Sequence, residues 1–186
     1  MEFKNKDPLI ICVCGKAGSG KSSVAKYIFN KYKENKLDVI MSPYTKYLKK
    51  YISEITGWNM EDQDKPRELL QKISSDLIKN KLGNKDFFIN RQIEDIDIYS
   101  YFFDIIIIPD VRFPEEIEIL KDKYNNLISI GVIRNDYDNG LSENQKNDIT
   151  ETSLDAYENY DYVLNNDGTD KLFKDTLEII KNIERR

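Results

Sequence analysis

The sequence contains no histidine. This absence excludes histidine general bases, histidine partners of a nucleophile and histidine metal ligands, so catalysis has to rest on carboxylates, lysines, arginines, backbone amides and bound metal. Cysteine is nearly absent too. Cys12 and Cys14 stand two apart in an extended stretch, so they share a face and cannot form a disulfide with each other. We interpret both as reduced thiols of the core, as in a cytoplasmic protein, and a C-x-C metal or redox site is the alternative.

Long apolar runs are missing as well. Runs such as Leu9–Cys14 and Ile105–Pro109 are far shorter than the roughly 20 residues of a membrane-spanning helix. The charged residues 1–8 lack the apolar region of a signal peptide. The net charge of −5 argues against nucleic acid or an anionic membrane as a partner, so a bound anion needs a local cluster of positive groups. We therefore predict a cytoplasmic protein with no nucleic-acid partner and no membrane partner, and the sequence leaves a homodimer open.

What the sequence does contain is an alternation of apolar runs with helix-like stretches, which is typical of an α/β fold with a parallel sheet. The length suits one domain, residues 1–186. The apolar runs predict five strands, at Leu9–Cys14, Asp38–Met41, Phe103–Ile108, Leu127–Ile133 and Tyr160–Leu164. Two stretches depart from the alternation: roughly sixty residues with about three helices separate the second strand from the third, and residues 135–150 are polar without periodicity. The polar stretch is either a solvated loop or a mobile lid.

Helix boundaries follow from capping residues and from the spacing of apolar side chains. Ser42 followed by Pro43 predicts a helix start, and Gly57 after Thr56 predicts the end of that helix. The next helix opens at Pro66 and is predicted to keep five apolar side chains on one face: Leu69, Leu70, Ile73, Leu77 and Ile78. Further helices are predicted over residues 21–33 and 86–98, and from residues 114 and 170 onward.

The most specific motif lies between the first strand and the first helix. Gly15, Gly20, Lys21 and Ser22 fill the pattern G-x-x-x-x-G-K-[ST] of a phosphate-binding P-loop. Glycines let the backbone curl so that several N–H groups point at one anion, and the helix N-terminus adds partial positive charge. Lys21 is expected to reach the β- and γ-phosphates, and the Ser22 hydroxyl to ligate Mg²⁺. A glycine-rich turn that binds nothing is the alternative, and the complete pattern between strand and helix argues against it.

A second polar cluster follows the third predicted strand. Asp110 and Arg112 come directly after its apolar run, and ligands of open α/β sheets bind at the carboxyl ends of strands, the edge where the P-loop also lies. There a carboxylate can hold Mg²⁺ or orient an attacking oxygen, and an arginine can bind phosphate through two parallel hydrogen bonds. The alternative is an Asp–Arg turn that pairs with itself. The shared edge favours function.

Other basic side chains are candidates for anion binding. Arginine is scarce inside the chain, and its planar fork suits phosphate better than the lysine ammonium does. Arg67 and Arg91 lie in the large helical stretch, and Arg134 opens the polar one. Each could equally be a surface arginine. Lys46 and Lys49 are further candidates, and the sequence does not rank them.

With these motifs the chain resembles the nucleoside monophosphate kinase-like P-loop kinases, and within them most the deoxynucleoside monophosphate kinases of phage and bacterial type. The segments that carry the resemblance are spread over nearly the whole chain: residues 15–22, 44–58, 66–71, 110–114 and 160–169. The resemblance implies a three-layer P-loop kinase fold with a five-stranded parallel sheet, an acceptor-binding helical insertion at about 42–98 and a lid at about 134–152.

The resemblance also implies cofactors and roles for single residues. ATP and Mg²⁺ would be the cofactors. The ATP-binding residues would be Gly15, Lys16, Ala17, Gly18, Ser19, Gly20, Lys21, Ser22 and Ser23 of the P-loop, Arg134 of the lid, and Asn166, Asp167 and Gly168 near the adenine. Ser22 and Asp110 would hold the metal. The catalytic residues would be Lys21, Arg67, Arg91, Asp110 and Arg112.

We therefore predict an enzyme of the nucleoside monophosphate kinase type, which moves a phosphoryl group from ATP to the phosphate of a small monophosphate, a deoxynucleoside monophosphate. Its partners are ATP and that small phosphorylated acceptor. Two alternatives stay open: phosphomevalonate kinase or another small-molecule P-loop kinase, and, from a different class, a regulatory nucleotide-binding module. The helical insertion and the internal arginines favour a kinase, because a module without an acceptor needs neither.

Overall fold

The computed structural model describes residues 3–61, 64–135, 137 and 140–185. The insertion predicted at 42–98 includes residues 62–63, and the lid predicted at 134–152 includes residues 136 and 138–139, so both fall partly outside the described residues. The first two residues of the charged N-terminal segment also lie outside them.

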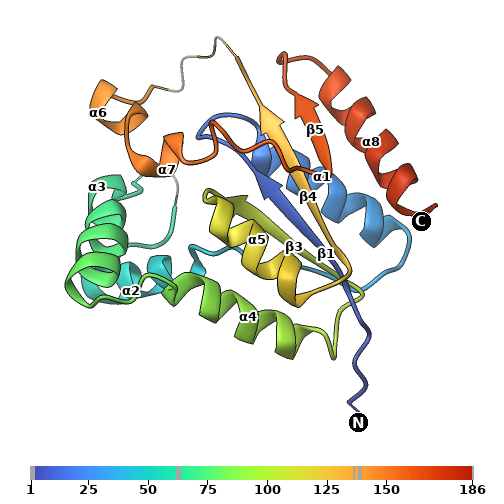
Figure 1. The fold of residues 1–186 in the computed structure, drawn as a ribbon, viewed down its shortest axis with the longest axis horizontal. Helices are drawn as coiled ribbons and strands as arrows, with labels where there is room; N and C mark the ends of the chain where they lie inside the picture. The colour runs from blue at the N-terminus through green and yellow to red at the C-terminus, as the bar shows by residue number, and fades with distance from the viewer. Residues whose placement is uncertain (1–2, 62–63, 136, 138–139, 186) are drawn as a thin grey trace.

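A parallel five-stranded sheet forms the centre of the fold (Figure 1). Its strands, in the spatial order β2-β3-β1-β4-β5, are β1 (Leu9–Cys14), β2 (Val39–Met41), β3 (Ile105–Val111), β4 (Leu127–Ile133) and β5 (Tyr162–Asn165). In the central strand, Ile10 pairs with Ile106 on one side and Leu127 on the other. Nearly all of β1 is buried, as expected of a parallel sheet covered on both faces. The five predicted strands are confirmed, with ends that differ by a few residues.

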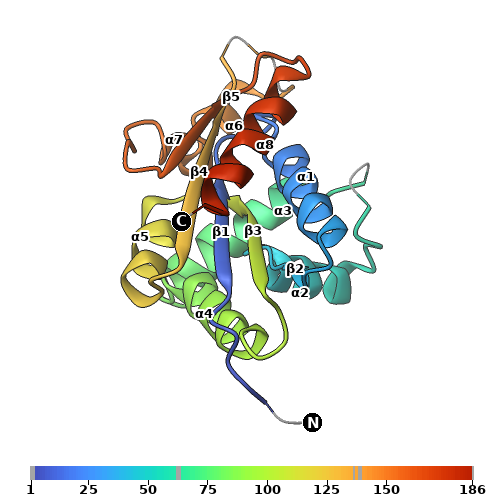
Figure 2. The ribbon, with the colours of Figure 1, turned by 90° about the vertical axis from the view of Figure 1, so that its right-hand side faces the viewer.

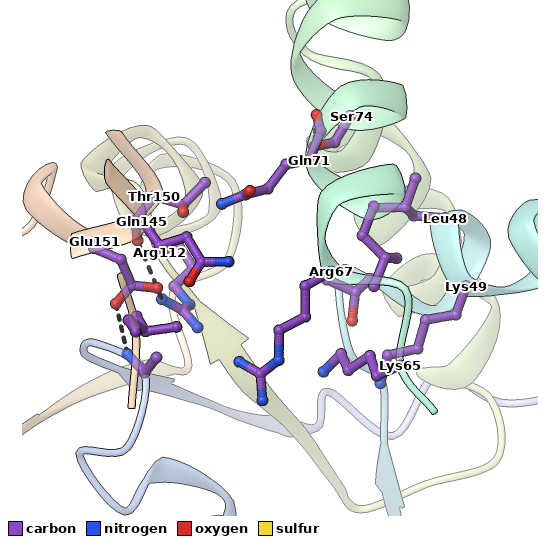
Figure 3. Close-up of a pocket in the computed structure, with 14 residues that line it drawn as sticks. Leu48, Lys49, Lys65, Arg67, Gln71, Ser74, Arg112, Gln145, Thr150 and Glu151 are labelled. Carbon is purple, nitrogen blue, oxygen red and sulfur yellow. Dashed lines mark hydrogen bonds and ion pairs between the residues drawn. The ribbon is translucent and has the colours of Figure 1, made fainter. Parts of the chain in front are cut away.

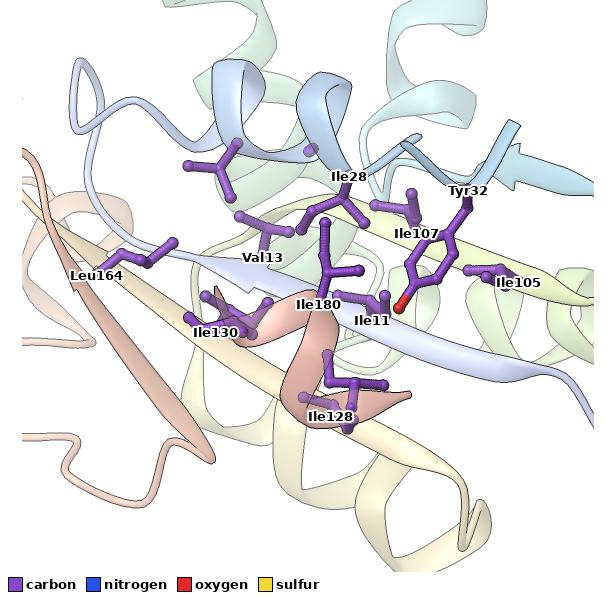
Figure 4. Packing of buried hydrophobic residues seen from close by; sticks show 14 of the residues in the cluster. Ile11, Val13, Ile28, Tyr32, Ile105, Ile107, Ile128, Ile130, Leu164 and Ile180 are labelled. Atoms are coloured by element: carbon purple, nitrogen blue, oxygen red, sulfur yellow. The ribbon is translucent and has the colours of Figure 1, made fainter. Parts of the chain in front are cut away.

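Helices cover both faces of the sheet and complete three layers. Their bounds are α1 (Lys21–Glu34), α2 (Lys46–Thr56), α3 (Arg67–Gln71), the π-helix η1 (Lys72–Lys81), α4 (Phe87–Tyr99), α5 (Pro114–Lys123), α6 (Glu143–Lys146), α7 (Ile149–Thr152) and α8 (Lys171–Ile183). α1 and α8 pack on one face, against alternate strand residues such as Ile11 and Val13 (Figure 4). α4 and α5 pack on the opposite face, and Figure 2 shows the sheet nearly edge-on between the two layers. In the described part of the chain, no helix has the length and apolar character that crossing a membrane requires.

Cys12 and Cys14 both belong to the core on the α4–α5 face. Both thiols are free and fully buried. Burial raises the pKa of each thiol, so the protonated form is favoured. The two side chains therefore pack as small apolar groups, as the sequence predicts.

In its described residues, the large crossover between β2 and β3 forms three helical segments, α2, α3 with η1, and α4. α2 ends at Thr56 as predicted, because Gly57 adopts the left-handed conformation with φ of 74°. The predicted start at Ser42 is wrong. The hydroxyl of Ser42 is buried and accepts a hydrogen bond from Gln92 Nε2 at 3.1 Å. A tertiary contact thus uses the group that would cap the helix, and α2 begins only at Lys46.

The segment η1 alters the apolar face predicted for the second helix of the insertion. Ile78 is buried as predicted, but Leu77 is 40% exposed. π-helical hydrogen bonds join residue i to i+5, so the angle between successive side chains differs from the α-helical value on which the prediction rests. Leu70 packs with Leu48 and Trp58 in a small core that belongs to the insertion itself.

Candidate active site

The P-loop leads from β1 into α1 along a path that requires glycine at two points. Gly15 has φ of 140°, and a Cβ there would lie 2.4 Å from the carbonyl oxygen of Val132. Gly20 has φ of 102°, and a Cβ there would lie 2.5 Å from the side-chain nitrogen of Asn166. That nitrogen donates a hydrogen bond to the carbonyl of Ser19 at 2.8 Å. Asn166, which follows β5, therefore lies directly against the P-loop.

Lys21, the first residue of α1, is buried beneath the P-loop and only 7% exposed. Its ammonium donates a hydrogen bond to the carbonyl of Lys16. Burial, and after it the positive charge of Arg112, lowers the pKa of Lys21 to about 7, although the carboxylates of Glu151 and Asp110 act in the opposite direction. An approaching phosphate would favour the charged form again. Lys21 is therefore poised to take up a proton when an anion binds.

Arg112 follows β3 and extends towards the P-loop. Its Nη1 donates hydrogen bonds to the carboxylate of Glu151 and to the carbonyl of Thr150, the latter at 3.2 Å (Figure 3). The backbone N–H of Ala17, in the P-loop, donates to the same carboxylate at 2.7 Å. A P-loop amide and the arginine predicted to bind phosphate therefore converge on one anionic group.

The backbone at Arg112 is held by Glu116, in the first turn of α5. Its buried carboxylate accepts the N–H groups of Arg112 at 2.7 Å and of Phe113 at 3.1 Å. Burial raises the pKa of Glu116 to about 7, and the charge of Asp110 adds to the increase, whereas the two N–H donors lower it. The N–H groups of Arg112 and Phe113, which have no partner within α5, are thereby hydrogen-bonded. These two bonds fix the backbone position from which the Arg112 side chain extends.

The carboxylate of Asp110 ties the end of β3 to the residues before α2. Its Oδ1 accepts the N–H of Tyr44 at 2.8 Å, and its Oδ2 accepts the N–H of Thr45 at 3.2 Å and the Thr45 hydroxyl at 2.6 Å. A carboxylate offers about four lone-pair sites, so Asp110 keeps room for a further partner. Ser22 and Pro109, the neighbour of Asp110, line a common cavity. Hydroxyl and carboxylate oxygens are ligands of the kind that Mg²⁺ prefers, but Asp110 itself does not line this cavity, so the role of Ser22 and Asp110 as metal ligands stays a prediction.

A cavity of about 190 Å³ lies between Arg112 and the helical insertion. Ala17, Arg112 and Glu151 line it on the side of the sheet. The insertion contributes three positively charged side chains to the same lining: Lys49, Lys65 and Arg67. Figure 3 shows Arg67 extending from α3 into the space that faces Arg112. Cations from two separate parts of the chain thus surround one cavity, which is what binding of phosphate groups requires.

The structure distinguishes two lysines that the sequence does not rank. Lys49 lines the cavity. Lys46 instead forms an ion pair with the buried carboxylate of Asp95 at 2.5 Å and a hydrogen bond with the hydroxyl of Tyr99 at 2.9 Å. Lys46 therefore joins α2 to α4, and Lys49 is the lysine of α2 that faces the cavity.

Arg91 is not brought to this cavity. Its side chain, on α4, is 43% exposed and forms an ion pair with Glu94 at 2.7 Å. The guanidinium carbon lies 5.7 Å from the ring centroids of Tyr47 and Phe87. These contacts keep the guanidinium on the surface of the insertion, and the catalytic role suggested for Arg91 stays a prediction.

Another cavity, of about 360 Å³, adjoins the P-loop. Residues 15–19 line it together with Arg134, whose guanidinium carbon lies 3.5 Å from the ring centroid of Tyr137. Gly168 is close as well, since a Cβ built on it would lie 3.4 Å from an Arg134 nitrogen. The carboxylate of Asp167 is used for hydrogen bonds within its own turn. The structure therefore gathers Arg134 and Gly168 beside the P-loop, whereas Asp167 serves the turn before α8.

Glu151 and the two short helices that place it are not among the features predicted from the sequence. The stretch after β4 forms α6 and α7, where the sequence shows only a polar stretch without periodicity. A signal for α6 does exist: Ser142 accepts the N–H of Gln145 at 3.4 Å while the Gln145 side chain accepts the N–H of Ser142 at 3.0 Å, a capping box of the form S-x-x-Q. Asp148, the N-cap of α7, with Glu151 three residues later marks the start of the second short helix, but nothing local predicts where Glu151 docks, because its partner Ala17 lies 134 residues away.

Comparisons with solved structures identify P-loop kinases with the same architecture. APS kinase of Mycobacterium tuberculosis, solved in complex with AMPPNP and APS, is 14% identical with a TM-score of 0.59, over 95% of this chain and 98% of that chain. Shikimate kinase from Bacteroides thetaiotaomicron is 12% identical with a TM-score of 0.51, over 96% of this chain and 99% of that chain. At such identities the likeness establishes the fold alone, and it confirms the predicted P-loop kinase fold.

The family assignment rests on a comparison of the sequence with protein-family models. A search of curated proteins finds no match. The family model described as deoxynucleotide monophosphate kinase, however, matches residues 46–176, well over half of the chain and all of the segment from α2 to the middle of α8. This match covers the helical insertion from residue 46 onward, Arg112 and Glu151, and it begins after the P-loop. The chain therefore belongs to the deoxynucleotide monophosphate kinase family and is a phosphotransferase of the nucleotide kinase type.

Proposed function

We propose that the protein transfers the γ-phosphoryl group of ATP to the phosphate of a deoxynucleoside monophosphate. The observation that carries the proposal is the cavity between the P-loop and the insertion. One side holds the amide of Ala17 and the guanidinium of Arg112, both bonded to Glu151 in the phosphate-free protein, and the other presents Lys49, Lys65 and Arg67. Two sets of positive groups that face each other suit two phosphates that have to meet in line.

Positioning and charge neutralisation account for the reaction. The P-loop amides and Lys21 would hold the transferred phosphoryl group, and Arg112 would stabilise the charge that spreads over its oxygens during transfer. Mg²⁺, when bound, would be held by Ser22 and Asp110 and would neutralise phosphate charge. The acceptor phosphate is already ionised at neutral pH, so no side chain has to act as a general base.

The acceptor would lie with its phosphate against Arg67 and its base deeper in the insertion. Leu48 and Leu70 supply apolar surface in the cavity, and Gln71 and Ser74 supply hydrogen-bonding groups. Such a mixture suits a flat base with a polar edge. An isoprenoid phosphate would use the cations and the leucines but would make no hydrogen bond with the side-chain amide of Gln71; the hydroxyl of Ser74 already donates to the backbone carbonyl of Gln71 at 3.1 Å.

A coupled assay with ATP tests the assignment. The four deoxynucleoside monophosphates, their ribonucleotide counterparts and mevalonate phosphate are compared as acceptors. We expect at least one deoxynucleoside monophosphate to be phosphorylated far better than mevalonate phosphate. Robust turnover of mevalonate phosphate with none of any nucleotide would refute the substrate class. ATP binding without turnover of any acceptor would favour the regulatory module.

Arg67→Ala tests the acceptor side of the cavity. Losing a charge-assisted contact to the acceptor phosphate should raise the acceptor KM, or lower kcat, about tenfold to hundredfold while ATP binding is unchanged. Lys50→Ala is the matched control, because Lys50 also carries positive charge on the insertion but is exposed and pairs with Glu54 on α2. Equal kinetics for Arg67→Ala and Lys50→Ala would remove Arg67 from the site.

A further inference from the structure

Glu151 places a carboxylate where the proposed mechanism requires a phosphoryl group. Its side chain is 10% exposed. Oε2 accepts the P-loop amide of Ala17 at 2.7 Å, and Oε1 accepts Arg112 Nη1. Figure 3 shows both interactions meeting at this one side chain. A backbone amide of a P-loop and an arginine fork are donors that proteins use for phosphate oxygens, and here they are used by a carboxylate.

The surrounding charges show that Glu151 acts as a counter-ion for the phosphate-binding groups. Its negative charge favours the ammonium form of the buried Lys21, against the effects of burial and of Arg112. The carboxylate of Glu151 therefore interacts with three groups: it accepts hydrogen bonds from the Ala17 amide and Arg112, and its charge stabilises the ammonium of Lys21. A phosphoryl group cannot take the same donors while the carboxylate occupies them.

Glu151 belongs to α7, the single helical turn at the end of the predicted lid. The turn is capped by Asp148, whose carbonyl accepts the N–H of Glu151 at 2.9 Å and of Thr152 at 3.2 Å. A helix of one turn is not stable by itself in water. Its order therefore depends on docking, and the contacts of Glu151 and of the Thr150 carbonyl with Arg112 supply that docking.

We propose that Glu151 is an internal competitor of the transferred phosphoryl group, which docks α7 on the P-loop when no phosphate is bound and is expelled when the nucleotide enters. The exchange couples occupancy of the P-loop to the position of α7. It goes beyond the proposed function, since it concerns access to the nucleotide site and does not depend on which acceptor is phosphorylated.

Glu151→Gln tests the competition directly, because glutamine keeps the size of the side chain and removes its charge. Binding of pyrophosphate and of a non-hydrolysable ATP analogue is measured by calorimetry. If the carboxylate is docked about nine-tenths of the time in the phosphate-free enzyme, both ligands should bind about tenfold more tightly to the variant. Glu143→Gln is the matched control: Glu143 is an exposed glutamate of α6 that pairs with Lys146, and its variant should bind as the wild type does. Unchanged or weaker binding to Glu151→Gln would refute the proposal.

Hydrogen exchange of the wild-type enzyme provides a second test that needs no variant. Amides 151–153, which are bonded within α7, should exchange faster after pyrophosphate alone is added, because the carboxylate that docks the turn is displaced. The same amides should exchange faster in phosphate-free Glu151→Gln than in Glu143→Gln. Slower exchange of amides 151–153 with pyrophosphate would show that phosphate and Glu151 bind together, and would overturn the competition.

Discussion

Replacing Lys21 by methionine should stabilise the nucleotide-free protein at neutral pH while removing phosphoryl transfer. The reason is the burial of its ammonium, which lowers the pKa of Lys21 from its ordinary value of 10.5 to about 7. Between these two pH values the unfolded chain holds a proton that the folded protein has released. The contribution of Lys21 to the free energy of unfolding therefore rises as the pH increases from 7 to 10.5. Its destabilising effect on the folded state is largest at and below pH 7.

The size of the effect follows from the same values. At roughly 1.4 kcal/mol per pKa unit, the penalty at pH 7 is about 4 kcal/mol. Methionine has a similar length and no charge to desolvate, but it leaves the carbonyl of Lys16 without its hydrogen bond, which offsets about 1–2 kcal/mol. The expected net gain in the free energy of unfolding is about 2–3 kcal/mol at pH 7, and it should shrink by about 2 kcal/mol at pH 9.

Urea unfolding of the wild type and of Lys21→Met at pH 7 and pH 9 measures how the difference in their free energies of unfolding changes with pH. Taking the difference between variant and wild type cancels the other titrating groups. Lys26→Met is the control, since Lys26 is an exposed lysine of the same helix and its replacement should leave stability within about 0.5 kcal/mol. A Lys21→Met protein that is no more stable than the wild type at pH 7, or whose gain does not shrink with pH, would refute the reasoning. Turnover of the folded variant should fall at least about 100-fold, because a cation aimed at the transferred group is lost.

Two further predictions concern the same donors. Arg112→Lys keeps the positive charge but loses the planar guanidinium, so kcat should fall about tenfold or more with little change in stability. Steady-state kinetics measure this effect. Unchanged kcat and KM for both substrates would mean that Arg112 has only a structural role. Binding of ATP at pH 8 should be accompanied by uptake of about one proton, because the phosphates restore the charge of Lys21. Calorimetry in buffers of different ionisation enthalpy measures that uptake, and its absence in the wild type would show that Lys21 is already charged.

The sequence by itself determined the strands, most helix ends and the P-loop. These features depend on local patterns: an apolar run forms a buried strand, as in β4 at Leu127–Ile133, and a glycine pattern shapes one turn. The place of Arg112 could also be anticipated, because the carboxyl ends of parallel strands meet at one edge of the sheet. Each of these inferences uses residues that are close along the chain or a rule of topology.

Tertiary structure alone decided which groups meet. Ser42 has the residue type of a helix cap, but Gln92, fifty residues later, uses its hydroxyl. Lys46 and Lys49 are alike in sequence, and only the packing of α2 on α4 turns one to Asp95 and the other to the cavity. The pattern Asp148-x-x-Glu151 marks the start of α7, but no local signal predicts where Glu151 docks. Its contacts are with donors of the P-loop and of Arg112, which follows β3. Partners so distant in sequence produce no periodic pattern, because their contact depends on how the whole sheet folds.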